Sequence, residues 1–226
     1  MKAVFFDVDF TLIYPGPTLQ AEGHRAFCER HGVTIDPSRF GTAVKEASSL
    51  LYSGDQLYDA RIFIDYTRRI IELMGGSGPG VLEASREIYD EWALCHHFSL
   101  YDDVAPTLQR LHREGYRIGL ISNTHRCLAS FQSHFALEGL ITAAVSSSGH
   151  GYMKPHPSIF QAALTLAGTQ PEESVMVGDS YAHDIAGAQA LGMRGILIAR
   201  ALGSGAGQDT PGCPVVGSLH EIFEYL

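Results

Sequence analysis

The sequence predicts an α/β protein whose core is a doubly wound parallel sheet. Short apolar segments recur along the chain, and segments with helical periodicity separate them. Strands that alternate with helices favour right-handed crossover connections, and therefore a parallel sheet. The segments expected to be buried strands are residues 3–6, 116–122, 174–178 and 195–199, with a weaker one at 141–145. The helices expected between them are residues 104–114, 125–135, 157–167 and 182–191.

Residues 15–95 interrupt this alternation, because they contain helix patterns and no convincing buried strand. The helices expected within them are residues 18–31, 57–74 and 81–94. We therefore expect a core made of residues 1–14 and 96–226, with a helical insertion at 15–95 directly after the first strand. Residues 203–214 are rich in turn-forming residues and are expected to form a mobile surface loop.

Composition and charge narrow the possible functions. Apolar residues make up 45% of the chain and charged residues 18%, which is typical of a folded globular protein. The net charge of −9 argues against a nucleic-acid-binding surface, which is normally basic. No apolar stretch approaches the roughly 18 residues of a membrane span, so no membrane partner is expected. The cysteines lack metal-type spacing, and we interpret them as buried thiols in a reducing cytoplasm: Cys28, Cys95, Cys127 and Cys213.

Polar residues follow the predicted strands at the points where each strand ends. In an open α/β sheet, ligands bind beyond the carboxyl ends of the strands, so these residues are expected to share one site. They are Asp7, Asp9 and Thr11 after the first strand, Ser122 and Asn123 after the second, Lys154 after the third, and Asp179 and Asp184 after the fourth.

These residue types suit phosphoryl transfer. The carboxylates of Asp7, Asp9 and Asp179, if close together, need a cation, and oxygen ligands suit Mg²⁺. Lys154 would offset remaining negative charge, and Ser122 could hydrogen-bond phosphoryl oxygens. One carboxylate could act as nucleophile and split hydrolysis into two easier steps.

Four segments resemble the motifs of the haloacid dehalogenase-like hydrolase superfamily, in the expected order. They are VFFDVDFTL, LISN, MKPHPSIF and VGDSYAHD. The resemblance covers the core, and the helical insertion fits the cap domain that this family carries after its first motif. It implies a Rossmann-like sheet with the first strand at its centre, between the strands that end at Ser122 and Gly178.

The first motif implies the catalytic roles. By resemblance, Asp7 is the nucleophile and a metal ligand. Asp9 is the general acid and base, with its backbone carbonyl on Mg²⁺, and Thr11 supports the loop. Position 10 is Phe where the family commonly has Gly, and we expect its ring to pack on the following loop or to narrow the site.

The other motifs imply the binding roles. Ser122 and Asn123 are expected to bind the phosphoryl group, and Lys154 to neutralise it and orient the nucleophile. Asp179 is expected to be a metal ligand, and Asp184 to hold the metal's waters or neighbouring groups.

The resemblance implies a Mg²⁺-dependent phosphatase that hydrolyses a small phosphorylated metabolite through an aspartyl-phosphate. One alternative is a phosphomutase of the β-phosphoglucomutase kind. Another is a 2-haloacid dehalogenase, which is disfavoured because those enzymes lack the second aspartate of the first motif, here Asp9. A binding protein without turnover is disfavoured because Asp7 and Asp179 are both present. A receiver domain would place its aspartate later, in a shorter chain. The sequence identifies neither the substrate nor the oligomeric state.

Histidines outside the motifs receive weaker predictions. His96 and His97 resemble a metal-ligand pair, but adjacent residues point in different directions and no third ligand is evident in the sequence. We therefore expect no metal there. Among the histidines near the motifs, His125 is the strongest candidate for contact with substrate.

Overall fold

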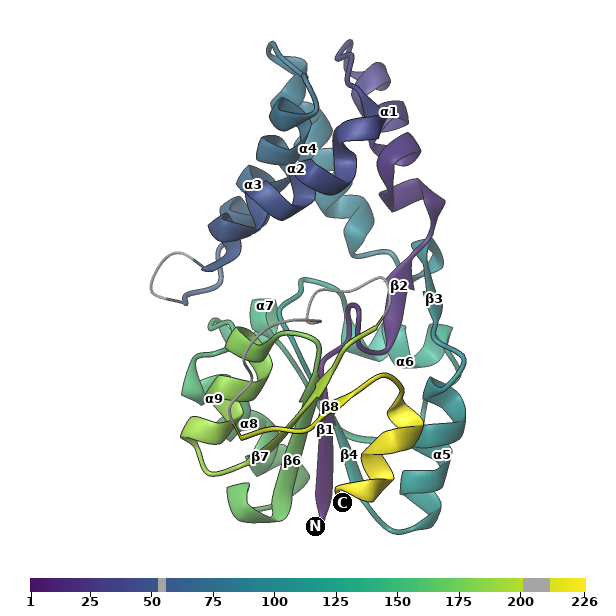
Figure 1. Cartoon of the computed structure of the whole chain (residues 1–226), viewed down its shortest axis with the longest axis vertical. Helices are drawn as coiled ribbons and strands as arrows, with labels where there is room; N and C mark the ends of the chain where they lie inside the picture. Colours follow the sequence, from purple (N-terminus) through teal and green to yellow (C-terminus); the bar gives the residue numbers. More distant parts are fainter. Residues whose placement is uncertain (53–55, 201–211) are drawn as a thin grey trace. The chain divides into compact units, whose positions relative to one another are not determined.

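The computed structural model describes residues 1–52, 56–200 and 212–226 (Figure 1). The chain forms two compact units. One contains Met1–Tyr14 and Leu100–Leu226, and the other is Pro15–Ser99. The second unit therefore extends four residues beyond the predicted end of the insertion at residue 95, because a 3₁₀ turn at Cys95–His97 continues from its last helix.

The first unit is built on a parallel sheet in which each strand pairs with its neighbours in the same direction. In spatial order the strands of the described part are β5 (Ile141–Ser146), β4 (Arg117–Ser122), β1 (Ala3–Phe6), β6 (Ser174–Gly178), β7 (Arg194–Ile198) and β8 (Val215–Val216). Strand β1 lies between β4 and β6, as the family resemblance implied (Figure 1). The short edge strand β8 was not predicted.

The register of β1 places the motif residues. Phe6, the last residue of β1, pairs with Leu120 of β4 on one side and with Val177 of β6 on the other. All four residues of β1 are fully buried, as expected for the central strand of a sheet covered on both faces. The residues that follow these three strands therefore emerge side by side at the carboxyl edge of the sheet.

Helices cover the sheet with apolar faces. Helix α8 (Pro157–Ala167) buries Phe160 against Phe5 and Met176 of the sheet. Helix α5 (Val104–Arg113) contacts β4, and its buried residues are Val104, Thr107, Leu108 and Leu111. The remaining α-helices of the described core are α6 (Leu128–His134), α7 (Ser147–His150) and α9 (Ala186–Ala190), and short 3₁₀ helices lie at Pro171–Glu173 and Leu219–Glu224.

Some predicted elements differ in the structure. The helix predicted at 125–135 begins only at Leu128. The helix predicted at 182–191 is a π-helical turn, Tyr181–Ile185, followed by α9. The Ser180 hydroxyl accepts a hydrogen bond from the His183 N–H at the start of that turn. The loop predicted at 203–214 lies largely outside the described residues.

The second unit is helical. Its helices are α1 (Ala21–Arg30), α2 (Phe40–Ala47), α3 (Ala60–Leu73) and α4 (Gly80–Trp92), with 3₁₀ turns at Pro17–Leu19, Pro37–Arg39, Ser48–Tyr52 and Cys95–His97. Helix α3 packs on α2 and α4, and α1 packs on α4. Helix α2 was not predicted.

Two short strands lie where the units join along the chain. Strands β2 (Ile13–Pro15) and β3 (Phe98–Leu100) form a separate two-stranded sheet. Just beyond it, the Gly16 N–H donates to the carbonyl of His97 over 2.7 Å. Segments of three residues carry too little periodicity to be recognised in a sequence, and neither strand was predicted.

Two further sequence expectations can be compared with the described residues. None of the described helices has the length and apolar character needed to cross a lipid bilayer. The cysteines were expected to be buried, but this is true only of Cys28. Cys127 is exposed, because it precedes α6 at the N-cap position.

A buried histidine lies on α1 in the second unit. His24 is 3% exposed and packs against the ring of Phe40, with ring centroids 4.7 Å apart. Its Nδ1 atom lies 3.0 Å from the carbonyl of Gln20. Burial lowers the pKa of His24 to about 4, while the contact with Gln20 opposes this shift. The folded protein therefore holds His24 neutral at pH values where an unfolded chain would protonate it.

We expect this histidine to make the protein less stable in mild acid. Between about pH 6.5 and pH 4, the unfolded chain binds a proton at His24 that the folded chain does not, so stability falls as the pH falls. The shift corresponds to about 3 kcal/mol at most. The free energies of unfolding of wild type and His24→Leu should be measured with denaturant at pH 7 and at pH 4. From pH 7 to pH 4, the free energy of unfolding of wild type should fall by about this amount more than that of the variant. A difference that stays constant with pH would contradict the assignment.

Candidate active site

Asp7 is the first residue after β1 and lies at the carboxyl edge of the sheet. Its backbone N–H donates to the Val177 carbonyl over 2.9 Å, so the β1–β6 pairing fixes its main chain. The residue is 7% exposed. It therefore presents a carboxylate at the centre of the edge, between the ends of β4 and β6.

The chain reverses immediately after Asp7. The N–H groups of Leu12 and Ile13 both donate to the Val8 carbonyl, and the Phe10 N–H donates to Ile13. Phe10 has a φ of 63°, in the left-handed region. A side chain there costs roughly 1–2 kcal/mol, which glycine would avoid. This explains structurally why position 10 suits Gly and why Phe10 departs from the motif at an energetic cost.

Lys154 connects the motifs. Its Nζ atom donates to Asp7 Oδ1 at 2.6 Å, to Asp184 Oδ1 at 2.6 Å and to the Ile121 carbonyl at 2.7 Å. These three bonds use all three N–H donors of the ammonium group, so its position is fixed. Burial opposes the charge, but the carboxylates of Asp184 and Asp7 outweigh it and raise the pKa of Lys154. The ammonium group therefore stays charged although it is buried.

Asn123 holds the main chain of Lys154. Its side-chain Oδ1 accepts from the Lys154 N–H at 2.7 Å, and its Nδ2 donates to the Lys154 carbonyl at 3.0 Å. The sequence predicted a phosphate-binding role for Asn123. In the structure its amide side chain holds the main chain of Lys154, and the phosphate-binding role stays a prediction.

Asp184 lies in the π-helical turn and faces back toward the end of β6. Its Oδ1 accepts from Lys154, and its Oδ2 accepts from the Ser180 N–H at 3.0 Å. Its carboxyl group packs directly over Gly178, where an added Cβ would lie 2.2 Å from Asp184 Oδ2. Glycine at this strand end therefore provides the space that Asp184 needs to reach Lys154.

Three carboxylates gather at this edge of the sheet. Asp7, Asp179 and Asp184 each offer an oxygen, and these oxygens lie within 4.8 Å of one another. Burial, together with repulsion between the carboxylates, raises the pKa of Asp7 and of Asp179, although Lys154 opposes both shifts. Three carboxylates and one ammonium group leave two formal negative charges. The donor set and this charge both fit a divalent cation with oxygen ligands, such as Mg²⁺.

Two buried hydroxyl groups lie beside the carboxylates in sequence and structure. Ser122 ends β4 and is 1% exposed, and Thr11 follows the reversal after β1 and is fully buried. Within the part of the chain that the structure describes, neither hydroxyl has a hydrogen-bond partner. A buried hydroxyl normally has one, so each can accept or donate to a bound group.

Arg126 is a site residue that the sequence analysis missed. It is 1% exposed, and its Nη1 atom lies 3.0 Å and 3.2 Å from the two carboxylate oxygens of Asp9. Its N–H is held by the Thr124 hydroxyl, in the turn before α6. Burial raises the pKa of Asp9, while Arg126 works in the opposite direction. Arg126 therefore contacts the first motif through Asp9.

Arg200 is a second buried arginine that the sequence analysis missed, and it holds the loop that follows β1. Arg200 follows β7 and donates to the Thr11 carbonyl at 2.8 Å. It also donates to both oxygens of Asp103, at 2.8 Å and 2.9 Å. Asp103 accepts further bonds from the Ser218 hydroxyl and the Leu219 N–H. Burial acts to raise the pKa of Asp103, but these bonds outweigh it and lower the pKa.

Comparison with known proteins identifies the family. The model of the haloacid dehalogenase-like hydrolases matches residues 1–192, which include all four motifs. The chain belongs to this family. It is therefore a hydrolase, and the parallel sheet, which has six strands among the described residues, is the Rossmann-like core of a haloacid dehalogenase-like enzyme.

Relatives of this haloacid dehalogenase-like hydrolase cover most of its length. It is 33% identical over 198 residues to pyrophosphatase PpaX of Bacillus cereus, covering 86% of this chain and 81% of the relative. It is 30% identical over 210 residues to a glyceraldehyde 3-phosphate phosphatase of Pyrococcus furiosus, covering 86% and 79%. The solved structure of the HAD-hydrolase YfnB of Bacillus subtilis, with magnesium bound, matches at a TM-score of 0.74 and 16% identity, covering 100% and 98%.

We expect Gly178→Ala to impair this hydrolase by displacing Asp184. The new methyl group would lie 2.2 Å from Asp184 Oδ2 and 2.3 Å from its Cγ, so the carboxylate must move away from Lys154. A displacement of that size typically costs about 100-fold in turnover. Gly41→Ala, where no atom lies within 4 Å of the added Cβ, is the matched control. Turnover assays should show a loss for Gly178→Ala alone, and equal activity of the two variants would contradict the packing argument.

Proposed function

We propose that this enzyme is a Mg²⁺-dependent phosphatase that hydrolyses a small phosphorylated metabolite through a covalent intermediate on Asp7. The observation that carries the proposal is the set of contacts around Lys154. This ammonium group fixes Asp7 at the sheet edge. Together with Asp7, Asp179 and Asp184 it carries two formal negative charges, which suit a divalent cation, and the bound cation would in turn attract a phosphate. The names of the relatives from Bacillus cereus and Pyrococcus furiosus, a pyrophosphatase and a phosphatase, support the same class.

In the first step, a carboxylate oxygen of Asp7 attacks phosphorus and the bond to the leaving oxygen breaks. Asp9 donates its proton to that oxygen, so the substrate leaves as an alcohol. In the second step, water gives a proton to Asp9 and attacks the phosphorus. The bond to Asp7 breaks, and inorganic phosphate leaves. Asp9 thus acts as an acid in the first step and as a base in the second, while Asp7 is first the nucleophile and then the leaving group.

The remaining groups stabilise charge on the phosphoryl oxygens. The Ser122 hydroxyl, which is buried at the end of β4, would donate to one of them. Lys154 keeps Asp7 deprotonated and oriented for attack. Asp7 and Asp179, with the Asp9 carbonyl, would hold Mg²⁺, which when bound offsets negative charge on the carboxylates and the phosphate. Asp184 positions Lys154 through its 2.6 Å contact.

Asp9 suits the role of general acid because two opposing effects act on it. Burial raises its pKa, which is the direction that favours proton donation, and Arg126 limits that shift. Arg126 also fixes the direction of the carboxyl group through two contacts to its oxygens. This second aspartate separates the proposed phosphatase from the 2-haloacid dehalogenases. A phosphomutase uses the same residues, and isomerisation activated by a sugar bisphosphate would identify it.

Residues 15–99 fit the role of a substrate-selecting cap. They form a helical unit of their own, inserted directly after the first catalytic motif. In this proposal the core supplies the chemistry, and the inserted unit decides which phosphorylated molecule is accepted.

The nucleophile is tested by Asp7→Asn. Wild type should release phosphate from p-nitrophenyl phosphate in the presence of Mg²⁺, and chelation should abolish this activity. The amide cannot form the covalent intermediate, so turnover should fall by at least about 1000-fold, as it does when other enzymes lose a nucleophile. Circular dichroism should show that the variant remains folded. Activity within tenfold of wild type, or full activity after chelation, would exclude this mechanism.

The role of Asp9 is tested by Asp9→Asn with two leaving groups. An alkoxide needs a proton to leave, whereas p-nitrophenolate leaves without one. General acid catalysis is worth roughly 10²–10⁴-fold where it is needed. Single-turnover phosphorylation of the variant should therefore slow far more with an alkyl phosphate than with p-nitrophenyl phosphate.

Single turnover is required because Asp9 also acts in the second step. Slow hydrolysis of the intermediate would otherwise lower both steady-state rates together. Equal losses for the two substrates in the phosphorylation step would show that Asp9 is not the general acid.

A further inference from the structure

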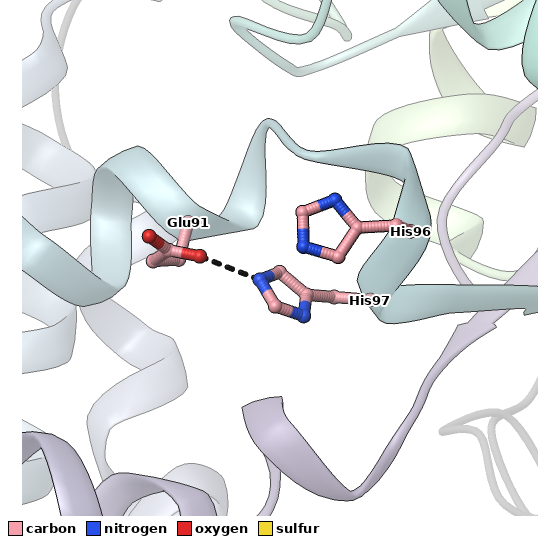
Figure 2. A group of neighbouring side chains, drawn as sticks. All are labelled: Glu91, His96 and His97. Carbon is pink, nitrogen blue, oxygen red and sulfur yellow. Dashed lines mark hydrogen bonds and ion pairs between the residues drawn. The ribbon is translucent and has the colours of Figure 1, made fainter.

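A second group of metal-ligating side chains lies in the helical unit, away from the four motifs in the sequence. It consists of Glu91, in the last turn of α4, with His96 and His97, in the 3₁₀ turn that follows. One ligand atom from each residue lies within 4.8 Å of the other two. Figure 2 shows both imidazole rings projecting toward the side where the Glu91 carboxylate lies.

The backbone explains why two adjacent histidines point the same way. In a regular strand they would face opposite sides, which is why the sequence argued against a paired role. Here they occupy the end of a 3₁₀ turn, after which Phe98 returns to extended geometry. The ring centroids of His96 and His97 lie 4.0 Å apart, with the planes tilted by 49°. The expectation drawn from adjacency was therefore wrong.

The sequence analysis also did not identify the third ligand, Glu91. The chain turns back after α4, and the N–H groups of Leu94 and His97 donate to the carbonyls of Glu91 and Leu94. This turn brings the Glu91 side chain onto His97, with Oε2 2.5 Å from Nε2 (Figure 2). Hydrogen bonds therefore fix the backbone of the group.

We propose that Glu91, His96 and His97 form a binding site for Zn²⁺. Two imidazole nitrogens and one carboxylate oxygen form a donor set that Zn²⁺ uses in proteins, with water as the fourth ligand. Mg²⁺ prefers oxygen donors and is not expected here. The side chain of His97 is 11% exposed and that of Glu91 is 30% exposed, while His96 is exposed. The metal would therefore enter from the His96 side.

The adjustment needed for binding is small. Ligand atoms on a tetrahedral Zn²⁺ lie about 3.3 Å apart, given bonds of about 2.0–2.1 Å. The Glu91–His97 pair must open slightly from 2.5 Å, since the metal replaces the proton between them. His96 must approach by a rotation of its exposed side chain. The main chain can stay in place.

The position of the site suggests what the metal would do. The His97 carbonyl accepts from Gly16, where the chain enters the helical unit, and β3 begins at the next residue. An added Cβ at Gly16 would lie 3.0 Å from this carbonyl oxygen, so the two segments are closely packed. A bound Zn²⁺ would tie the end of α4 to this junction and stabilise the folded state.

The test is a titration of the full-length protein with Co²⁺, which reports tetrahedral sites by visible absorption. The protein is first stripped with a chelator and then kept in excess Mg²⁺, which occupies the carboxylate site. We expect about one Co²⁺ per chain, with tetrahedral bands that Zn²⁺ removes. The affinity should fall at least 100-fold in His96→Ala, His97→Ala and Glu91→Gln, because each change removes a ligand and even supporting residues cost about 10–100-fold.

The chain provides a matched control. His31 and Glu87 form another histidine–glutamate pair in the same unit, with Nε2 and Oε2 2.7 Å apart, but they belong to no three-residue ligand group among the described residues. His31→Ala should bind Co²⁺ like wild type. Circular dichroism checks that each variant is folded. If His97→Ala is unfolded, the Co²⁺ affinity of His96→Ala decides the test, because the exposed side chain of His96 can be removed without disturbing the fold. Absence of the tetrahedral bands in wild type, or equal affinities for His96→Ala and His31→Ala, would overturn the proposal.

Discussion

The buried ammonium group of Lys154 is the interaction on which the catalytic edge depends. An isolated buried charge is costly, and this one persists because Asp7, Asp184 and a strand carbonyl accept all of its N–H donors. The same bonds hold carboxylates close together, which repulsion would otherwise separate. Asn123 fixes the lysine's backbone, and the gap over Gly178 admits Asp184. Asp7 and Lys154, which lie 147 positions apart in the sequence, are thereby held in direct contact.

The carboxylates at this edge of the sheet differ in how far neighbouring basic groups offset their charge. Asp9 forms an ion pair with Arg126, which offsets the charge of its carboxylate within the protein. Asp7, Asp179 and Asp184 have one lysine among them, and the negative charge that remains fits the proposed cation. Two aspartates two residues apart thus acquire different properties from their neighbours. In the proposed mechanism, this difference in surroundings would let one residue type serve as nucleophile and as acid.

The sequence predicted those parts of the fold in which apolar residues recur with the period of a strand or a helix. Buried strands with polar ends predicted the central sheet, and the register of β1 against β4 and β6 brings those ends together. Arg126 and Arg200 were missed because a buried arginine has no periodic signature and depends on partners distant in sequence. The Glu91 contact to His97 was missed for a different reason, since it is formed by an irregular turn after the helix, which has no periodic pattern in the sequence.

The carboxylate of Asp103 has a consequence for how the chain can be altered. It accepts bonds from Arg200, Ser218 and Leu219, and Arg200 in turn holds the carbonyl of Thr11. The start of the C-terminal 3₁₀ helix is therefore linked through Asp103 and Arg200 to the loop that carries Asp9, the proposed proton donor. A shortened protein that lacks residues from Ser218 onward would keep every catalytic side chain and still lose one of the supports of that loop. Under the proposed mechanism, activity would therefore depend on a C-terminal segment that contains none of the four motifs.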